Sequence, residues 1–299
     1  MTTFRAVPRF LIWPVVFVGT LVAAGWGFDR YNTALWAFVV SAANVILIVA
    51  LELLLPRDRG VNLFRDRQVP NDIGHGLLVA GIGRTVGGPI AAGVIALLSM
   101  VQPLSLGDGW PSHWRLGAQV ALGLVLWSLP SYWTHRWFHR IERLWWFHAV
   151  HHDADVMHVL KGNRIHVGED LARQLVMLLP LYALGVPGRV LLWISMWNNV
   201  EGALAHSNID FRFPAWAHWV LPTPANHYLH HALEEELHDA NFAAVSPLWD
   251  VLFGTYKHPD RNPVRGVGIE RSPVPERFGA QVLFPVMREI MGASSASQS

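Results

Sequence analysis

Long segments without charge constrain the fold of this chain more than any other feature. Phe10 to Phe28 is nineteen residues without a charged side chain, and a second apolar segment, Thr33 to Leu55, carries only Glu52 near its end. At a rise of about 1.5 Å per residue, either segment can cross a hydrocarbon core of about 30 Å as a helix. Charged residues are 15% of the chain, against about 25% in soluble domains. The sequence therefore predicts a protein that spans a membrane.

The first two segments are separated only by Asp29 to Asn32, which predicts an antiparallel helical hairpin with both ends on one side. A cleaved signal peptide is the competing interpretation of the first segment, but no small-residue cleavage site follows it. Positive charge is enriched on the cytoplasmic side of membrane proteins, so the arginines that flank the hairpin place its ends in the cytoplasm. These arginines are Arg5, Arg9, Arg57, Arg59, Arg65 and Arg67.

Two further segments can cross the membrane. Ile73 to Val101 is apolar but rich in glycine and interrupted by Arg84, so it can be one tilted span, a broken helix or a re-entrant segment. Leu116 to Thr134 is again nineteen uncharged residues and leads directly to His135. If the segment before it crosses, His135 lies on the cytoplasmic side.

A later apolar segment, Leu171 to Asn198, contains Pro180, Pro187 and Gly188. Proline interrupts the hydrogen bonding of a helix, so this segment is predicted to form two short helices that dip into the membrane, with a kink or break at each proline. The remainder of the chain is polar and ends in a Ser/Ala tail that is expected to be disordered.

The charge and the lack of cysteine exclude two kinds of site. The net charge is +1 and no basic stripe is present that could neutralise phosphates, so nucleic acid is not an expected partner. The chain has no cysteine, so neither a disulfide nor a thiolate metal site can form. Any metal must be held by nitrogen and oxygen ligands.

Half of the sixteen histidines fall into three sets with helical spacing. Residues three or four apart lie on one face of a helix, so each set offers two or three imidazoles together. A structural zinc site uses four ligands, and eight nitrogens therefore indicate two metal ions. Imidazole binds iron, copper, nickel and zinc alike, so the residue type does not select the metal. The sets are His135 and His139; His148, His151 and His152; and His227, His230 and His231.

The motifs around these histidines resemble those of the fatty acid hydroxylase and sterol desaturase superfamily, which are integral-membrane di-iron oxygenases. The similarity covers about Trp127 to Pro285, and the order of several independent motifs makes it specific. They are Tyr132-Trp133-Thr134-His135-Arg136 with His139, Leu144-Trp145-Trp146-Phe147-His148-Ala149-Val150-His151-His152, Asn163-Arg164-Ile165-His166, His206-Ser207-Asn208, Pro224-Ala225-Asn226-His227-Tyr228-Leu229-His230-His231, Asp239-Ala240-Asn241-Phe242, and Leu248-Trp249-Asp250-Val251-Leu252-Phe253-Gly254-Thr255.

The resemblance implies an all-α membrane bundle of about four spanning helices beneath a cytosolic helical cap. It divides the chain into N-terminal membrane segments (1–115), a catalytic domain (116–285) and the tail (286–299). It implies two non-haem iron ions, held by the eight histidines of the three sets as the catalytic centre and by His206. His166 is a weaker candidate ligand, and its other interpretation is a hydrogen-bonding role.

The chain departs from the superfamily pattern at two positions. Ser128 stands where relatives commonly carry an aspartate, and Val167 where many have proline. Neither change removes a ligand. Three polar residues in the later motifs, Asp239, Asn241 and Asp250, are expected to orient histidines by accepting their N–H groups, or to cap turns.

The resemblance implies a reaction in which dioxygen is used to hydroxylate or desaturate a lipid, such as a fatty acid or a sterol, and the sequence does not choose between these outcomes. No flavin, nicotinamide or haem motif is present, so electrons are expected from a ferredoxin or a cytochrome b5-like partner. Arg136, Arg140 and Arg143 could receive an acidic donor or could contact anionic lipid. A bacterial inner membrane is the expected location.

Two other classes of protein remain as alternatives. The same imidazoles could serve a non-catalytic membrane protein that carries a metal or haem. A hydrolase is disfavoured because no G-x-S-x-G motif is present.

Overall fold

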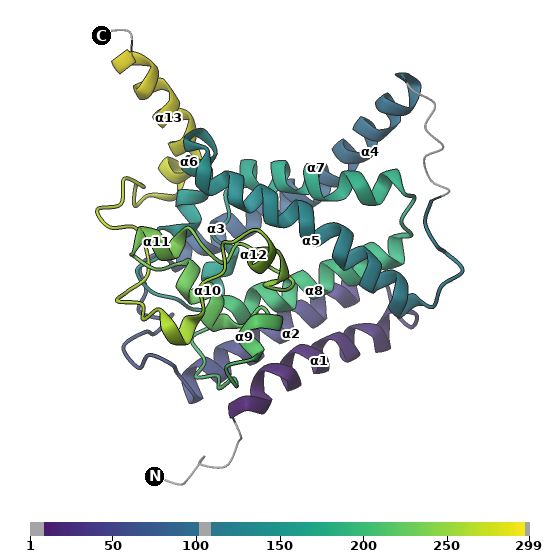
Figure 1. Cartoon of the computed structure of the whole chain (residues 1–299), viewed down its shortest axis with the longest axis horizontal. Coiled ribbons are helices and arrows are strands. Elements are labelled where there is room, and N and C mark those ends of the chain that lie inside the picture. The colour runs from purple at the N-terminus through teal and green to yellow at the C-terminus, as the bar shows by residue number, and fades with distance from the viewer. Residues whose placement is uncertain (1–8, 102–108, 297–299) are drawn as a thin grey trace.

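The computed structural model describes residues 9–101 and 109–296, and these residues form an all-α protein (Figure 1). Within them no β-strand forms, and the extended pairings are the isolated bridges Pro56–Ile209 and Ala232–Val267. The predicted all-α class is therefore confirmed. Arg5, which entered the charge argument, and 297–299 of the expected tail lie outside the described residues.

Long helices form the body of the molecule and short ones its cap. The long helices are α1 (Arg9–Phe28), α2 (Thr33–Leu54), α3 (Val69–Leu78), α4 (Arg84–Val101), α5 (Leu116–Arg140), α6 (Glu142–His152), α7 (Val167–Ala183), α8 (Gly188–His206) and α13 (Phe278–Ala296). The short elements are a π-helical turn η1 (Val79–Gly83), the 3-10 turns η2 (Val159–Asn163) and η3 (Pro259–Arg261), and α9 (Ala217–Val220), α10 (Pro224–His230), α11 (Glu235–His238) and α12 (Leu248–Leu252).

The predicted hairpin is formed by α1 and α2. Asn32 caps α2 by accepting a hydrogen bond from the Leu35 amide at 3.1 Å, and Thr20 of α1 donates to Asn44 of α2 at 3.0 Å. Large apolar side chains such as Phe38 and Ile46, each 69% exposed, cover the outer face of α2. In water such a face would be costly, and in lipid it is the expected surface.

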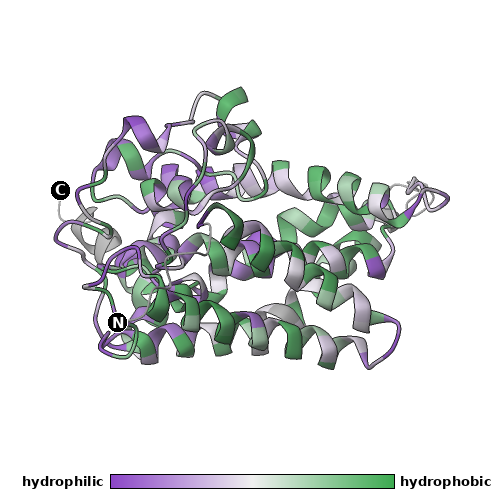
Figure 2. Ribbon diagram, turned by 90° about the horizontal axis from the view of Figure 1, so that it is seen from below, coloured by the Kyte–Doolittle hydropathy of each residue, from purple (hydrophilic) through white to green (hydrophobic). Residues whose placement is uncertain are grey.

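Three helical segments among the described residues are long and apolar enough to cross a membrane: Arg9–Phe28, Thr33–Leu54 and Val69–Leu97. The third is interrupted by the π-helical turn η1, so the glycine-rich segment is an irregular helix. The helix α5, predicted to be a further span, is not among the three. Figure 2 shows the apolar residues along the length of the long helices and the hydrophilic ones gathered where the cap lies, which is the pattern of a membrane protein.

The helices α7 and α8 follow one another in the chain but pack against different neighbours, α7 mainly against α4 and α5, and α8 against α1, α2 and α5. The break between them falls at Leu184 to Pro187, whereas Pro180, where a kink or break was also predicted, stays inside α7. The central helix is α8. Its Val200 and Leu204 pack against α1 and α2, and its Val190 and Ile194 pack against α5 and α7.

The cap lies over one end of α5 and α8, where α9 to α12 gather (Figure 1). It is attached to the hairpin by Glu52, which accepts hydrogen bonds from the amides of Val159 at 2.8 Å and Asn208 at 2.9 Å. The helix α13 runs across position 286, where the tail was expected to begin. The ends of α5 and α8, the helix α6 and the cap helix α10 therefore meet at the base of the cap, and they carry the histidines.

Candidate metal centre

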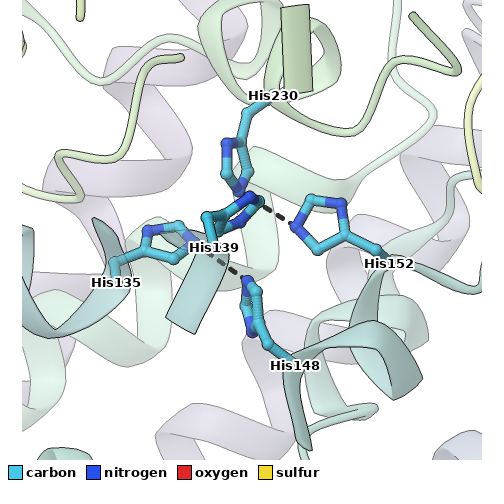
Figure 3. A group of neighbouring side chains, drawn as sticks. All are labelled: His135, His139, His148, His152 and His230. Carbon is cyan, nitrogen blue, oxygen red and sulfur yellow. Dashed lines mark hydrogen bonds between the residues drawn. The ribbon is translucent and has the colours of Figure 1, made fainter. Parts of the chain in front are cut away.

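Nine of the predicted histidines gather into two adjacent groups. The five-histidine group is His135, His139, His148, His152 and His230, and the four-histidine group is His151, His206, His227 and His231. In each group, one nitrogen of every ring lies within 4.8 Å of one nitrogen of every other. Figure 3 shows the five-histidine group with its rings converging from α5, α6 and α10.

Each H-x-x-H-H motif supplies both groups. On α6, His148 and His152 are four residues apart and share the face that points to the five-histidine group, while His151 is turned by about 100° from His152 and joins the other. The second motif divides the other way, because His227 and His231 enter the four-histidine group and His230 the five-histidine group. The spacing of the sequence therefore builds two sites side by side.

Hydrogen bonds fix which nitrogen of several rings faces inward. Carbonyl oxygens only accept, so His135 donates from Nδ1 to Phe242 O at 2.8 Å, and His230 donates from Nδ1 to Ala240 O at 2.8 Å. His206 likewise donates from Nδ1 to Gly202 O at 2.7 Å. In a neutral imidazole the other nitrogen then carries a lone pair. These three rings thus present unprotonated Nε2 atoms to the groups.

Several inward nitrogens lie within hydrogen-bond distance of one another, which is too close for two nitrogens that both carry lone pairs. His135 Nε2 lies 3.0 Å from His148 Nε2, and His206 Nε2 lies 3.2 Å from His151 Nε2 and 2.8 Å from His227 Nε2. His148 uses Nδ1 to donate to Glu169 at 2.9 Å, so its Nε2 is also an acceptor. Two acceptors at 3.0 Å repel unless a cation lies between them. The His135–His148 pair therefore fits a metal ion, and the same close spacing of imidazole nitrogens recurs in the four-histidine group.

The protonation state of the rings agrees with metal binding. Burial, reinforced by the neighbouring histidines, lowers the pKa of His151, His152, His227 and His231 well below the usual value. Burial does the same to the pKa of His230, beside His148. Neutral imidazole is the form that binds a metal. The site therefore holds its ligands ready at physiological pH.

Two carboxylates contact the outer nitrogens of the five-histidine group. Glu169, at the start of α7, is fully buried and accepts from His148 and from Arg173, the latter at 3.1 Å. Burial acts to raise the pKa of Glu169, but His148 and Arg173 outweigh it and hold that pKa below the usual value. Asp239 lies 3.2 Å from His139 Nδ1 and is partly exposed. Such partners fix the ring orientation and raise the basicity of a ligand.

The other two polar residues expected to serve the histidines contact the backbone instead. Asp250 accepts from the amides of Phe242 at 2.8 Å and Ala243 at 2.9 Å, and Asn241 accepts from the amide of Lys257 at 2.9 Å. By fixing Phe242, Asp250 also fixes the carbonyl to which His135 donates. Glu169 was missed in the sequence because nothing in its neighbourhood relates it to His148, twenty-one residues earlier.

His166 is not brought into either group. Its Nδ1 accepts from the Gly168 amide at 3.0 Å and so caps α7, and its Nε2 donates to Val282 O at 3.0 Å. Ser128, which replaces the aspartate of relatives, accepts from the indole of Trp249 at 2.9 Å. It makes no contact with a histidine among the described hydrogen bonds.

A cavity of about 570 Å³ adjoins both groups. It is bordered by His135 and His148 of one group and by His151, His206 and His227 of the other. Apolar side chains of α5, α7 and α8 form part of its wall: Trp127, Met177, Leu178, Leu191 and Ile194. A largely apolar chamber next to two candidate metal sites is a suitable place for a lipid.

The comparisons with known proteins agree with the site. Residues 120–255 match the family described as fatty acid hydroxylase. Over 286 residues, 93% of this chain and 84% of the relative, the sequence is 33% identical to the ornithine lipid hydroxylase OlsE of Rhizobium tropici. The chain belongs to the fatty acid hydroxylase family. The resemblance that the histidine motifs suggested is thereby confirmed.

More distant members of this superfamily match part of the chain. The human alkylglycerol monooxygenase is 26% identical over 53% of this chain and 34% of its own length. Methylsterol monooxygenase 1-2 of Arabidopsis thaliana is 26% identical over 56% of this chain and 58% of its own length. No solved structure matches the chain.

Proposed function

We propose that this fatty acid hydroxylase family member is a membrane-bound di-iron oxygenase that hydroxylates a C–H bond of a lipid. The observation that carries the proposal is the pair of histidine groups, whose acceptor nitrogens face one another beside an apolar cavity. The names of its relatives, which include a lipid hydroxylase and two monooxygenases, favour hydroxylation over desaturation.

The nine grouped histidines are the proposed ligands of two iron ions, five for one and four for the other. His166 is left out because both of its ring nitrogens are engaged elsewhere. When bound, the iron ions supply the oxidising power that breaks a C–H bond with dioxygen. Hydroxylation consumes one dioxygen, two electrons and two protons, and yields the alcohol and one water.

The protein itself orients the imidazoles, keeps water from the reacting carbon and gives the lipid access to the cavity. Glu169, Asp239 and the carbonyl oxygens of the cap hold the imidazoles with their acceptor nitrogens inward. The apolar cavity wall limits water near the reacting carbon, which suppresses side reactions. Because the body of the protein faces lipid, an apolar substrate can enter from the bilayer rather than from water.

The electrons are proposed to come from a ferredoxin or a cytochrome b5-like protein that docks on the cytoplasmic side. The exposed Arg140 lies 3.2 Å from Asp239, which in turn contacts His139. An acidic donor bound at Arg140 and Arg143 would therefore sit one side chain away from a ligand. Reversing both charges (Arg140→Glu with Arg143→Glu) should slow reduction and flatten its salt dependence. Unchanged rates would instead assign these arginines to anionic lipid.

The test of the centre is its iron content per chain, measured by mass spectrometry on protein purified without added metal. Wild type should hold about two irons. His151→Ala and His230→Ala remove a histidine from different groups, so each variant should lose at least one iron. One metal or none in well-folded wild-type protein, or a haem Soret band, would favour the non-catalytic carrier. Enzyme turnover is then tested by analysing the lipids of cells that make ornithine lipid.

The proposed location of the protein is a bacterial inner membrane.

A further inference from the structure

One buried carboxylate beside the centre has no partner. Glu201 on α8 is 8% exposed and lines the same cavity as His151, His206 and His227. No hydrogen bond or ion pair reaches its side chain from any described residue. Burying a carboxyl group without a partner is costly, and such a group calls for a functional role or a bound water, ion or ligand.

Each of the other buried carboxylates among the described residues contacts a hydrogen-bond donor or a cation of the protein. Glu52 accepts from two backbone amides, and Glu169 contacts His148 and Arg173. Asp72 lies 3.0 Å from the ammonium of Lys161, and Asp250 accepts from two amides. Glu201 is therefore an exception among the buried carboxyl groups that the structure describes, and burial raises its pKa to about 8; a cation beside it would favour the charged form.

The cavity carries further polar side chains besides Glu201. Asn198 and Asn199 of the same helix line it, and the side-chain oxygen of Asn199 is buried without a partner. Arg173 lines it as well and spends Nη1 on Glu169, which leaves further N–H groups of its guanidinium for an anion. A cavity for a hydrocarbon chain alone would need none of these side chains.

We propose that Glu201 binds the ammonium group of a lipid head group, so that the polar head of the substrate lies in the cavity next to the histidine groups. The inference deepens the proposed function and rests on it. It identifies the substrate class as a lipid with a cationic or zwitterionic amino head. An amino-acid head group also carries a carboxylate, for which Arg173 is the available cation. Ornithine, named in the relative from Rhizobium tropici, has such an amine.

The test compares two ligands that differ by one charge. The probes are an ornithine lipid with a free side-chain amine and the same lipid with that amine acetylated, each bound to the full-length purified protein and measured by native mass spectrometry. Wild type should bind the free amine about tenfold more tightly or better, since truncating one partner of a buried charge pair has effects of at least this size. Glu201→Gln, nearly identical in shape, should remove the preference.

The control is Glu289→Gln, which removes the same charge from an exposed ion pair with Arg143 on α13 and should keep the wild-type preference. Equal binding of both lipids by wild type, or an unchanged preference in Glu201→Gln, would overturn the inference. So would loss of iron from Glu201→Gln, because Glu201 would then serve the metal. Failure of the proposed function would be seen in a different measurement, as wild-type protein that contains no iron. The ligand preference of that protein could still be measured.

Discussion

The contacts of the individual histidines show that the protein orients several of the rings through the outer nitrogen. Backbone carbonyls do this for His135, His206 and His230, and a buried carboxylate does it for His148. Carbonyls hold a ring in place without adding charge. Glu169 adds a negative charge beside the five-histidine group, so its removal should weaken metal binding more than the loss of any other outer partner.

Glu169→Gln should therefore lower the iron affinity of the five-histidine group by about 10- to 100-fold, the range found when such outer partners are changed. Asp239→Asn should have a smaller effect, because Asp239 is partly exposed and its contact with His139 is longer. The measurement is the rate at which a chelator removes iron from each variant. If Asp239→Asn lost iron faster than Glu169→Gln, the burial of Glu169 would not be what determines the iron affinity.

His166 and His206 provide a direct contrast between a capping histidine and a proposed metal ligand. His166→Ala should keep about two irons and lose about 1 kcal/mol of stability, the usual effect of removing a helix cap. His206→Ala should lose iron, since its Nε2 faces His151 and His227. Iron content and thermal unfolding of the two variants separate these roles. Loss of iron from His166→Ala would restore it as a ligand.

Which parts of the site could be predicted depends on how far apart in the sequence the contacting residues lie. Histidines at positions such as 148, 151 and 152 were predictable because the helical period relates close neighbours. The assignment of His151 to one group and His152 to the other needed the structure. Glu169 and the carbonyl of Phe242 were not predictable, because a contact across many residues, or with the backbone, leaves no mark on the local sequence.

At the level of elements, the long helices were predictable and the connections between them were not. Uncharged segments gave the bounds of α1 and α2 to within a residue or so. The break between α7 and α8 was placed correctly at Pro187, but Pro180 does not break α7. A proline near a helix end removes one hydrogen bond that tertiary packing can compensate, so its position alone does not decide the outcome.

A buried charge cluster joins η2 to α3 and to the loop that precedes α3. The ammonium of Lys161 on η2 lies 2.6 Å from Asp66 and 3.0 Å from Asp72 of α3, and Arg164 lies 3.6 Å from Asp72. Asp66, Asp72 and His158 together resemble a cation site, but Lys161 already supplies the positive charge there. The cluster holds η2, and so the adjoining cavity wall at Gly162, against α3.

Lys161→Met should destabilise the protein by about 3 to 5 kcal/mol, because it removes the closest cation of Asp66 and leaves Asp72 only the more distant Arg164. Arg265→Met is the control, since its ion pair with Glu234 is exposed and its loss should leave unfolding unchanged. The measurement is the apparent thermal midpoint in detergent. A midpoint for Lys161→Met equal to that of the control would mean that the cluster does not hold η2 in place.

For the molecule as a whole, the apolar surface and the position of the cap determine how it sits in a membrane. Three segments can cross, and both ends of the α1–α2 hairpin lie with the cap (Figures 1 and 2). The α1–α2 turn is therefore expected on the opposite side of the bilayer from the histidines. Because the chain has no cysteine, single cysteines can report on each side without background.

Tyr31→Cys in the turn and Asp260→Cys in the cap are suited to this, since Tyr31 is 52% exposed and the Asp260 side chain 58% exposed. In intact bacterial cells an impermeant thiol reagent should label Tyr31→Cys at once and Asp260→Cys only after the inner membrane is opened. The reverse order would place the histidine groups outside and exclude a cytoplasmic electron donor. Labelling of both from one side would mean that α1 and α2 lie on the membrane without crossing it, so lipid would have to reach the cavity from the interface.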